Sequence, residues 1–144
     1  MHDGATLINA SRGEVADSEA LLRHSKRLTL CLDVWEGEPD NLNLELLEVA
    51  EIATPHIAGY SVQGKANASA IVIRALAERL GIEPLRNWYP EGVTQSQPRE
   101  IGWSQMCAQI DAHCHLMEET VRMKANPHDL EDRRNTYPLR EEFF

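Results

Sequence analysis

The residues of this sequence that could carry out chemistry are Arg12, Glu38 and His56, each of which follows a short apolar run. An arginine guanidinium can bind a carboxylate through two parallel hydrogen bonds and polarise a neighbouring carbonyl group. A histidine exchanges a proton near neutral pH. A carboxylate beside the histidine fixes its ring and favours its charged form, which keeps a proton available for a developing alkoxide. Together these groups suit hydride transfer coupled to proton transfer at a carbon next to a carboxylate.

Three apolar runs, over residues 5–9, 28–34 and 51–54, are expected to be the strands that position these residues. Each run is short and is bounded by turn-forming residues. The near-continuous apolar character of residues 28–34 is typical of a strand that is buried on both faces of a parallel sheet. The carboxyl ends of parallel strands meet at one edge of the sheet, where ligands bind. We therefore expect the three chemical residues to gather at that edge, whereas His56 alone would be interpreted as an ordinary loop histidine.

Helices are expected between and after these strands. Leucine spacing predicts short helices that begin near residues 18 and 42. A longer pattern over residues 62–80 predicts a third helix, with Gly81 as its C-terminal cap. Because strands and helices alternate along the chain, we predict an α/β fold with a parallel sheet.

Three segments of the sequence resemble consecutive motifs of the D-isomer-specific 2-hydroxyacid dehydrogenases. They read LINASRGEVAD over residues 7–17, LDVWEGEP over residues 32–39 and TPHIAGY over residues 54–60. Their order and approximate spacing are those of the family, and the resemblance covers about residues 4–81. Three features most resemble a member of the family that oxidises a small phosphorylated 2-hydroxy acid. They are the sequence of residues 35–39, the Gly59-Tyr60 pair that closes the third motif, and the extra segment after residue 82.

The resemblance implies a role for individual residues. Arg12 would bind the substrate carboxylate, His56 would be the acid/base, and Glu38 would be its carboxylate partner. The family implies NAD as cofactor and a homodimeric enzyme, with no metal ion in the site. The remaining implied contacts are made to the cofactor by Ala10, Ser11, Arg12, Asp33 and Gly59, and to the substrate by Tyr60.

The sequence divides at a stretch rich in proline and glycine. We predict a partial NAD-binding domain over residues 1–81, a linker over 82–99 and a partial dimerisation domain over 100–144. A single helix is expected over residues 100–124, with one apolar stripe. By resemblance, the first segment is the later half of a Rossmann-type parallel-sheet domain, and the last is part of a small C-terminal dimerisation domain.

The glycines limit what this chain is expected to do alone. No two of the eight glycines are separated by a single residue, so the sequence contains no G-x-G-x-x-G turn to hold a cofactor pyrophosphate. We therefore expect the 144 residues by themselves to be inactive as a dehydrogenase.

Composition excludes several classes of partner. The formal charge is −9 and no basic run occurs, which argues against nucleic acid and anionic membranes as partners. There is no apolar span long enough to cross a bilayer and no signal peptide, so we expect a cytoplasmic protein. The three cysteines have irregular spacing, which favours free thiols over disulfides.

Two alternatives remain open from the residues alone. The enzyme could be another D-2-hydroxyacid dehydrogenase, acting on glycerate or phosphoglycerate. The chain could instead be a non-catalytic interaction module that dimerises through the helix expected over residues 100–124. Cys107 and Cys114 fall on the apolar stripe of that helix, so we interpret them as buried structural thiols rather than as metal ligands.

Overall fold

The computed structural model describes residues 1–95 and 100–142, which belong to two compact units. The first unit consists of Met1–Ala58 and Cys114–Tyr137, and the second of the described residues in Gly59–His113 and Pro138–Phe144. The predicted division into residues 1–81, 82–99 and 100–144 stays a prediction, and residues 96–99 of the predicted linker lie outside the described residues.

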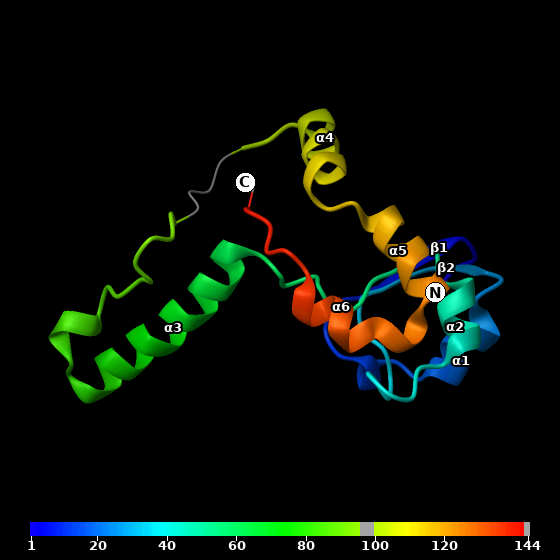
Figure 1. The fold of residues 1–144 in the computed structure, drawn as a ribbon, viewed down its shortest axis with the longest axis horizontal. Coiled ribbons are helices and arrows are strands. Elements are labelled where there is room, and N and C mark those ends of the chain that lie inside the picture. Colours follow the sequence, from blue (N-terminus) through cyan, green and yellow to red (C-terminus); the bar gives the residue numbers. More distant parts are fainter. Residues whose placement is uncertain (96–99, 143–144) are drawn as a thin grey trace. The chain divides into compact units, whose positions relative to one another are not determined.

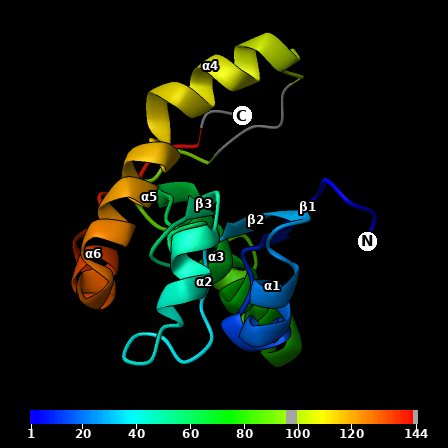
Figure 2. The ribbon, with the colours of Figure 1, turned by 90° about the vertical axis from the view of Figure 1, so that its right-hand side faces the viewer.

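The first unit is built on a parallel sheet of three strands in the order β1-β2-β3. They are β1 (Ala5–Asn9), β2 (Leu28–Leu32) and β3 (Ile52–Ala53). The register pairs Ala5 with Leu28 and Leu32 with Ala53, so the carboxyl ends of all three strands lie at the same edge (Figure 2). The predicted α/β fold with a parallel sheet is confirmed.

Two short helices, α1 (Ser18–His24) and α2 (Leu44–Val49), connect the strands. Each begins where a side chain accepts a hydrogen bond from the backbone of the first turn, Asp17 for α1 and Asn43 for α2. Their leucines pack on one face of the sheet around a buried core. The core includes Leu21, Leu30, Leu32, Leu46 and Leu47.

The other face of the sheet differs from the expectation of strands buried on both faces. Ile8 of β1 is 73% exposed, and Cys31 of β2 is only half-buried. The reason is that successive side chains of a strand point to opposite faces, and the buried core described above covers one face alone. The apolar run over residues 28–34 therefore did not indicate how many faces are covered.

The prediction of a single helix over residues 100–124 is wrong. The structure has α4 (Trp103–His113) and α5 (Leu116–Ala125), and His115 between them adopts a left-handed conformation with φ of 43°. The predicted stripe does not become a buried face either, because Trp103 and Val121 are largely exposed. Cys107 and Cys114 are half-buried rather than buried.

α5 (Figure 1) belongs to the first unit, where it lies beside the edge strand β3 (Figure 2). The backbone N–H of Ala53 donates to the hydroxyl of Thr120 at 3.0 Å, which satisfies a group that an edge strand would leave unpaired. Lys124 Nζ donates to the carbonyls of Glu48 and Ala50 at 2.8 Å, where the cation complements the C-terminus of α2. Leu130, the first residue of α6 (Leu130–Thr136), is fully buried in the core.

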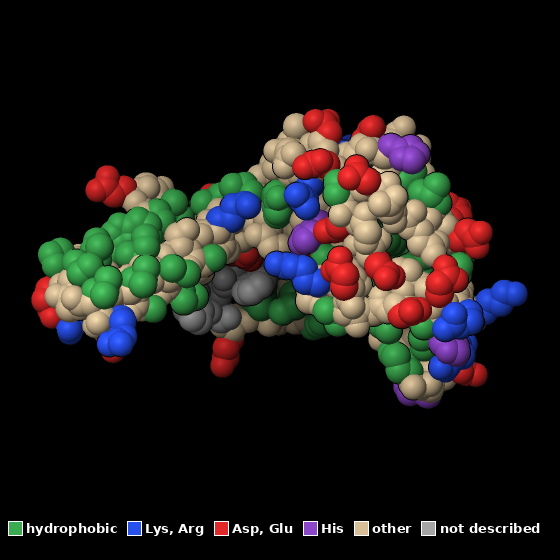
Figure 3. Space-filling view, turned by 90° about the horizontal axis from the view of Figure 1, so that it is seen from below, with side chains coloured by type: hydrophobic (Ala, Val, Ile, Leu, Met, Phe, Trp, Pro, Cys, Tyr) green, Lys and Arg blue, Asp and Glu red, His purple; other side chains and the backbone are tan. Residues whose placement is uncertain are grey.

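The second unit contains the long helix α3 (Val62–Leu80), whose bounds agree with the prediction. Ser61 caps its N-terminus, and Gly81 ends it with a left-handed φ of 68°. The C-terminal segment pairs with the start of α3, since Val62 N–H donates to the carbonyl of Arg140 at 2.9 Å. Hydrophobic side chains gather along α3 (Figure 3), and several of them are exposed. They include Ile71, Val72, Leu76 and Leu80.

The remaining elements of the described chain are short 3-10 turns. These are η1 (Gly13–Val15), η2 (Glu83–Leu85) and η3 (Pro127–Asp129). Across the described ranges, no helix combines the length and the hydropathy needed to cross a bilayer.

Candidate active site

His56 and Glu38 meet at the carboxyl edge of the sheet. Nδ1 of His56 is in hydrogen-bonding contact with Oε1 of Glu38, and both side chains are mostly buried, at 26% and 15% exposed. An ionised carboxylate can only accept a hydrogen bond, so Nδ1 carries the hydrogen and Nε2 is the nitrogen left to exchange a proton with a ligand. The contact between the two predicted residues is thus present, and the acid/base role of His56 stays a prediction.

Glu38 is itself held by the loop that follows β2. Its second carboxylate oxygen, Oε2, accepts from the backbone N–H of Trp35 at 3.1 Å. The indole N–H of Trp35 donates to the carbonyl of Thr54 at 3.0 Å, in the segment that leads to His56. Trp35 is 2% exposed, and this one buried residue holds Glu38 through its backbone N–H and the segment before His56 through its indole N–H. The sequence showed Trp35 only as part of the motif over residues 32–39, and this role was not predicted.

Asp33 lies at the end of β2 and is 6% exposed. Its Oδ1 accepts from the hydroxyl of Thr54 at 2.6 Å and from the N–H of Ile57 at 2.8 Å, and its Oδ2 accepts from the N–H of Ala58 at 3.0 Å. The carboxylate is therefore occupied by the turn that carries His56. A cofactor contact of Asp33 stays a prediction.

Arg12 lies in the loop after β1, at the same sheet edge, but it is exposed. Its Nη1 donates to the carbonyl of Ser11 at 2.6 Å, and within the described residues no contact joins it to Glu38 or His56. Of the three chemical residues, the structure thus brings Glu38 and His56 together and leaves the Arg12 side chain at the surface, bonded to its own loop.

The loop of residues 10–12 is shaped by Asn9, which sequence reasoning missed. Asn9 is 7% exposed, donates from Nδ2 to the carbonyl of Arg12 at 2.9 Å, and accepts from the N–H of Ser11 at 3.2 Å. An asparagine at the end of a strand is a known signal for such a side-chain turn. Ala10, Ser11 and Arg12 are all exposed, and their contacts with a cofactor stay predictions.

Gly13 lets the first loop approach the second. A Cβ atom at this position would lie 2.2 Å from the carbonyl carbon and oxygen of Trp35, so no side chain fits there without moving backbone. Glu36, the next residue, accepts from the N–H of Ser18 at 3.1 Å. The loops after β1 and β2 are therefore joined by close backbone packing and by a hydrogen bond.

Gly59 and Tyr60, the other predicted ligand contacts, belong to the second unit. A Cβ atom at Gly59 would meet nothing within 4 Å, so the backbone there is open to a ligand. The ring of Tyr60 lies 4.0 Å below Lys65 Nζ in a cation–π contact. Their roles stay predictions.

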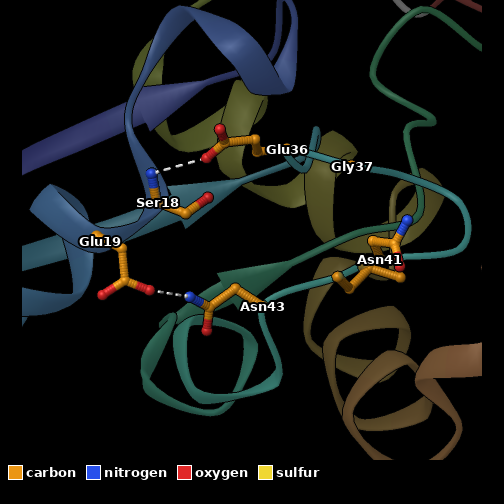
Figure 4. Close-up of a pocket in the computed structure, with 7 residues that line it drawn as sticks. Ser18, Glu19, Glu36, Gly37, Asn41 and Asn43 are labelled. Atoms are coloured by element: carbon orange, nitrogen blue, oxygen red, sulfur yellow. Dashed lines mark hydrogen bonds between the residues drawn. The ribbon is translucent and has the colours of Figure 1, made fainter.

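A pocket of about 350 Å³ in the first unit is lined by residues other than the predicted site residues (Figure 4). Its lining combines carboxylates and amides that bind one another, as Asn43 Nδ2 donates to Glu19 Oε1 at 3.1 Å. Gly37, at its rim, has a left-handed φ of 76° that permits the turn. The lining residues are Ser18, Glu19, Glu36, Gly37, Asn41, Leu42 and Asn43.

Cys31 on β2 has a raised pKa, first because burial disfavours the thiolate and second because the Glu51 carboxylate is near. The thiol is therefore protonated at neutral pH and is a poor nucleophile. Among the described residues, no group of three or more His, Cys, Asp or Glu side chains is arranged to hold a metal ion.

One family of known proteins matches the first part of the chain. Residues 1–58 match the family described as D-isomer specific 2-hydroxyacid dehydrogenase, NAD binding domain. The matched segment contains Asp33, Glu38 and His56 and the whole parallel sheet.

The chain is similar to proteins named erythronate-4-phosphate dehydrogenase. It is 40% identical to that of Photorhabdus laumondii over 148 aligned positions, which cover 96% of this chain and 35% of the relative. It is 53% identical to that of Teredinibacter turnerae over 87 residues, or 57% of this chain and 23% of the relative. It is 51% identical to that of Escherichia coli over 83 residues, which cover 56% of this chain and 22% of the relative. The chain therefore spans about a fifth to a third of the length of these relatives.

Proposed function

We propose that this chain supplies the proton-transfer residues of an NAD-dependent dehydrogenase that oxidises 4-phosphoerythronate to the 2-oxo acid, a step in pyridoxine biosynthesis. The observation that carries the proposal is the Glu38–His56 pair at the carboxyl edge of a parallel sheet. The names of the relatives supply the substrate. A cytoplasmic location and a homodimer are part of the same proposal.

In this reaction His56 acts as the general base. Nε2 accepts the proton of the 2-hydroxyl while the hydride leaves C2, and the C2–O bond becomes a carbonyl. Glu38 holds the Nδ1–H and stabilises the imidazolium that forms. Arg12 binds the carboxylate next to C2 and favours the developing 2-oxo group. In the reverse direction His56 returns the proton.

The residues present fit NAD. The loop of residues 10–12 that follows β1 is exposed, and hydrogen bonds of the Asn9 side chain set its shape. In the other unit, a Cβ atom at Gly59 would meet no atom within 4 Å. When bound, NAD would supply the hydride acceptor. Ala10, Ser11 and Arg12, with Gly59, would hold it.

The substrate is tested with a chimera, in which this chain replaces the matching segment of the Escherichia coli relative. We expect the chimera to reduce NAD with 4-phosphoerythronate and to prefer it to glycerate and 3-phosphoglycerate by at least about tenfold in kcat/KM. Absorbance at 340 nm measures the rate. Equal or faster oxidation of glycerate or 3-phosphoglycerate would contradict the proposed substrate.

The 144-residue chain alone should bind NADH no more tightly than about 1 mM, because it has no glycine turn to hold the pyrophosphate. Isothermal titration calorimetry measures the affinity, with the chimera as the binding-competent control. A micromolar dissociation constant would show that the expectation is wrong. Sedimentation velocity of the chimera, which has the full length of the enzyme, tests the homodimer, and a monomer at high concentration would contradict it.

A further inference from the structure

His56 adopts a backbone conformation that needs support. Its φ is 59°, in the left-handed region that a residue with a Cβ atom seldom occupies. It follows Pro55, whose own φ is fixed by its ring. Such a conformation persists only where the surrounding structure imposes it. Something other than local preference must therefore hold the His56 backbone.

Asp33 contacts the chain on both sides of His56. On the N-terminal side its carboxylate accepts from the Thr54 hydroxyl at 2.6 Å, and on the C-terminal side from the N–H groups of Ile57 and Ala58 at 2.8 and 3.0 Å. Its backbone carbonyl accepts from the N–H of His56 itself at 2.7 Å. All four bonds lie within the first unit.

The carboxylate is suited to this task because it can only accept. Asp33 is 6% exposed, and a buried charge is tolerated where several donors surround it. An asparagine of the same shape offers one acceptor oxygen, and its NH₂ group would face a backbone N–H that also donates. The charge of Asp33 is thus matched to donors of the turn.

We propose that Asp33 is a positioning residue, which holds residues 54–58 in the turn that aims the His56 ring at Glu38. This assigns the Asp33 carboxylate to the Thr54 hydroxyl and to the backbone N–H groups of Ile57 and Ala58, a role distinct from the cofactor contact that the family resemblance implies. The positioning is a property of the chain itself. Only its catalytic meaning rests on the proposed function.

The test is an NMR experiment on the 144-residue chain labelled with ¹⁵N. In Asp33→Asn we expect the ring Nδ1–H signal of His56 to broaden or disappear, because the ring no longer stays against Glu38. The amides of Ile57 and Ala58 should exchange with solvent at least about tenfold faster. The amide of Ala53, which is held by Thr120 instead, should be unchanged and serves as the internal reference. Asp40→Asn makes the same chemical change at an exposed position of the same connection between β2 and α2, and it should leave all these signals unchanged.

Two variants of Thr54 keep the proposal testable if Asp33→Asn does not fold. Thr54→Val removes one donor and leaves the charge, so it should weaken the His56 signal less than Asp33→Asn, and Thr54→Ser should restore it. An unchanged His56 Nδ1–H signal in a folded Asp33→Asn, or equal signals in Thr54→Val and Thr54→Ser, would overturn the proposal. No step requires turnover, so a chimera that fails to oxidise 4-phosphoerythronate would contradict the proposed function and leave this result standing.

Discussion

Replacing His56 by alanine should lower the kcat of the chimera by about 10²- to 10⁴-fold, the range in which a positioned general base contributes. The Kd for NADH should change by less than about threefold, because the imidazole moves a proton and is held by Glu38 rather than by the cofactor. Steady-state rates at saturating substrate and fluorescence titration with NADH measure the two quantities.

A matched control for this variant is His24→Ala. His24 is an exposed histidine at the end of α1, so its loss should leave kcat within about twofold of the parent value. If His56→Ala keeps the parental kcat, His56 is not the acid/base. If NADH binding falls as far as kcat does, the residue acts on the cofactor site instead.

Replacing Gly13 by alanine should destabilise the first unit by about 2–3 kcal/mol, at the upper end of what overpacking costs. The added Cβ would lie 2.2 Å from the carbonyl atoms of Trp35 and 2.4 Å from the N atom of Glu36, and backbone cannot rotate away as a side chain can. The loops after β1 and β2 would have to separate. Because Trp35 N–H also holds Glu38, the site should loosen with the fold.

Urea denaturation followed by circular dichroism measures the change in unfolding free energy. Gly102→Ala is the control, since a Cβ there would meet no atom within 4 Å and its backbone is not left-handed. It should leave the free energy of unfolding within about 0.5 kcal/mol of the parent. A Gly13→Ala protein as stable as the Gly102→Ala protein would mean that the two loops are not held in close packing.

Much of the fold could be predicted because its causes are local. Helix α3 has the predicted bounds since a serine cap, helical spacing and a left-handed glycine act within a few residues of each end. The strands were recognised from apolar runs between turn residues. The contact between Glu38 and His56 follows from the same reasoning, because parallel strands place their carboxyl ends together whatever the details of packing.

The break at His115 and the position of α5 had no comparable local signal. α5 joins the sheet through Thr120 and Ala53, which are 67 residues apart in the chain. The apolar stripe over residues 100–124 is present in the sequence, but it does not form the buried face of α5. The buried residues of α5 are Glu119, Thr120 and Met123, which lie on another face of the helix. Glu119 is buried because Arg122 and Arg133 pair with it.

The candidate site also has a part that the sequence indicated and a part that only the folded chain determines. Residue types and their order along the chain were enough to indicate an acid/base histidine, a carboxylate partner and an arginine, because these properties belong to the side chains themselves. How they are held depends on the folded chain. The three donors that meet Asp33 come from residues 21 to 25 positions away, and a hydrogen bond over that separation exists only after β2 and β3 have paired.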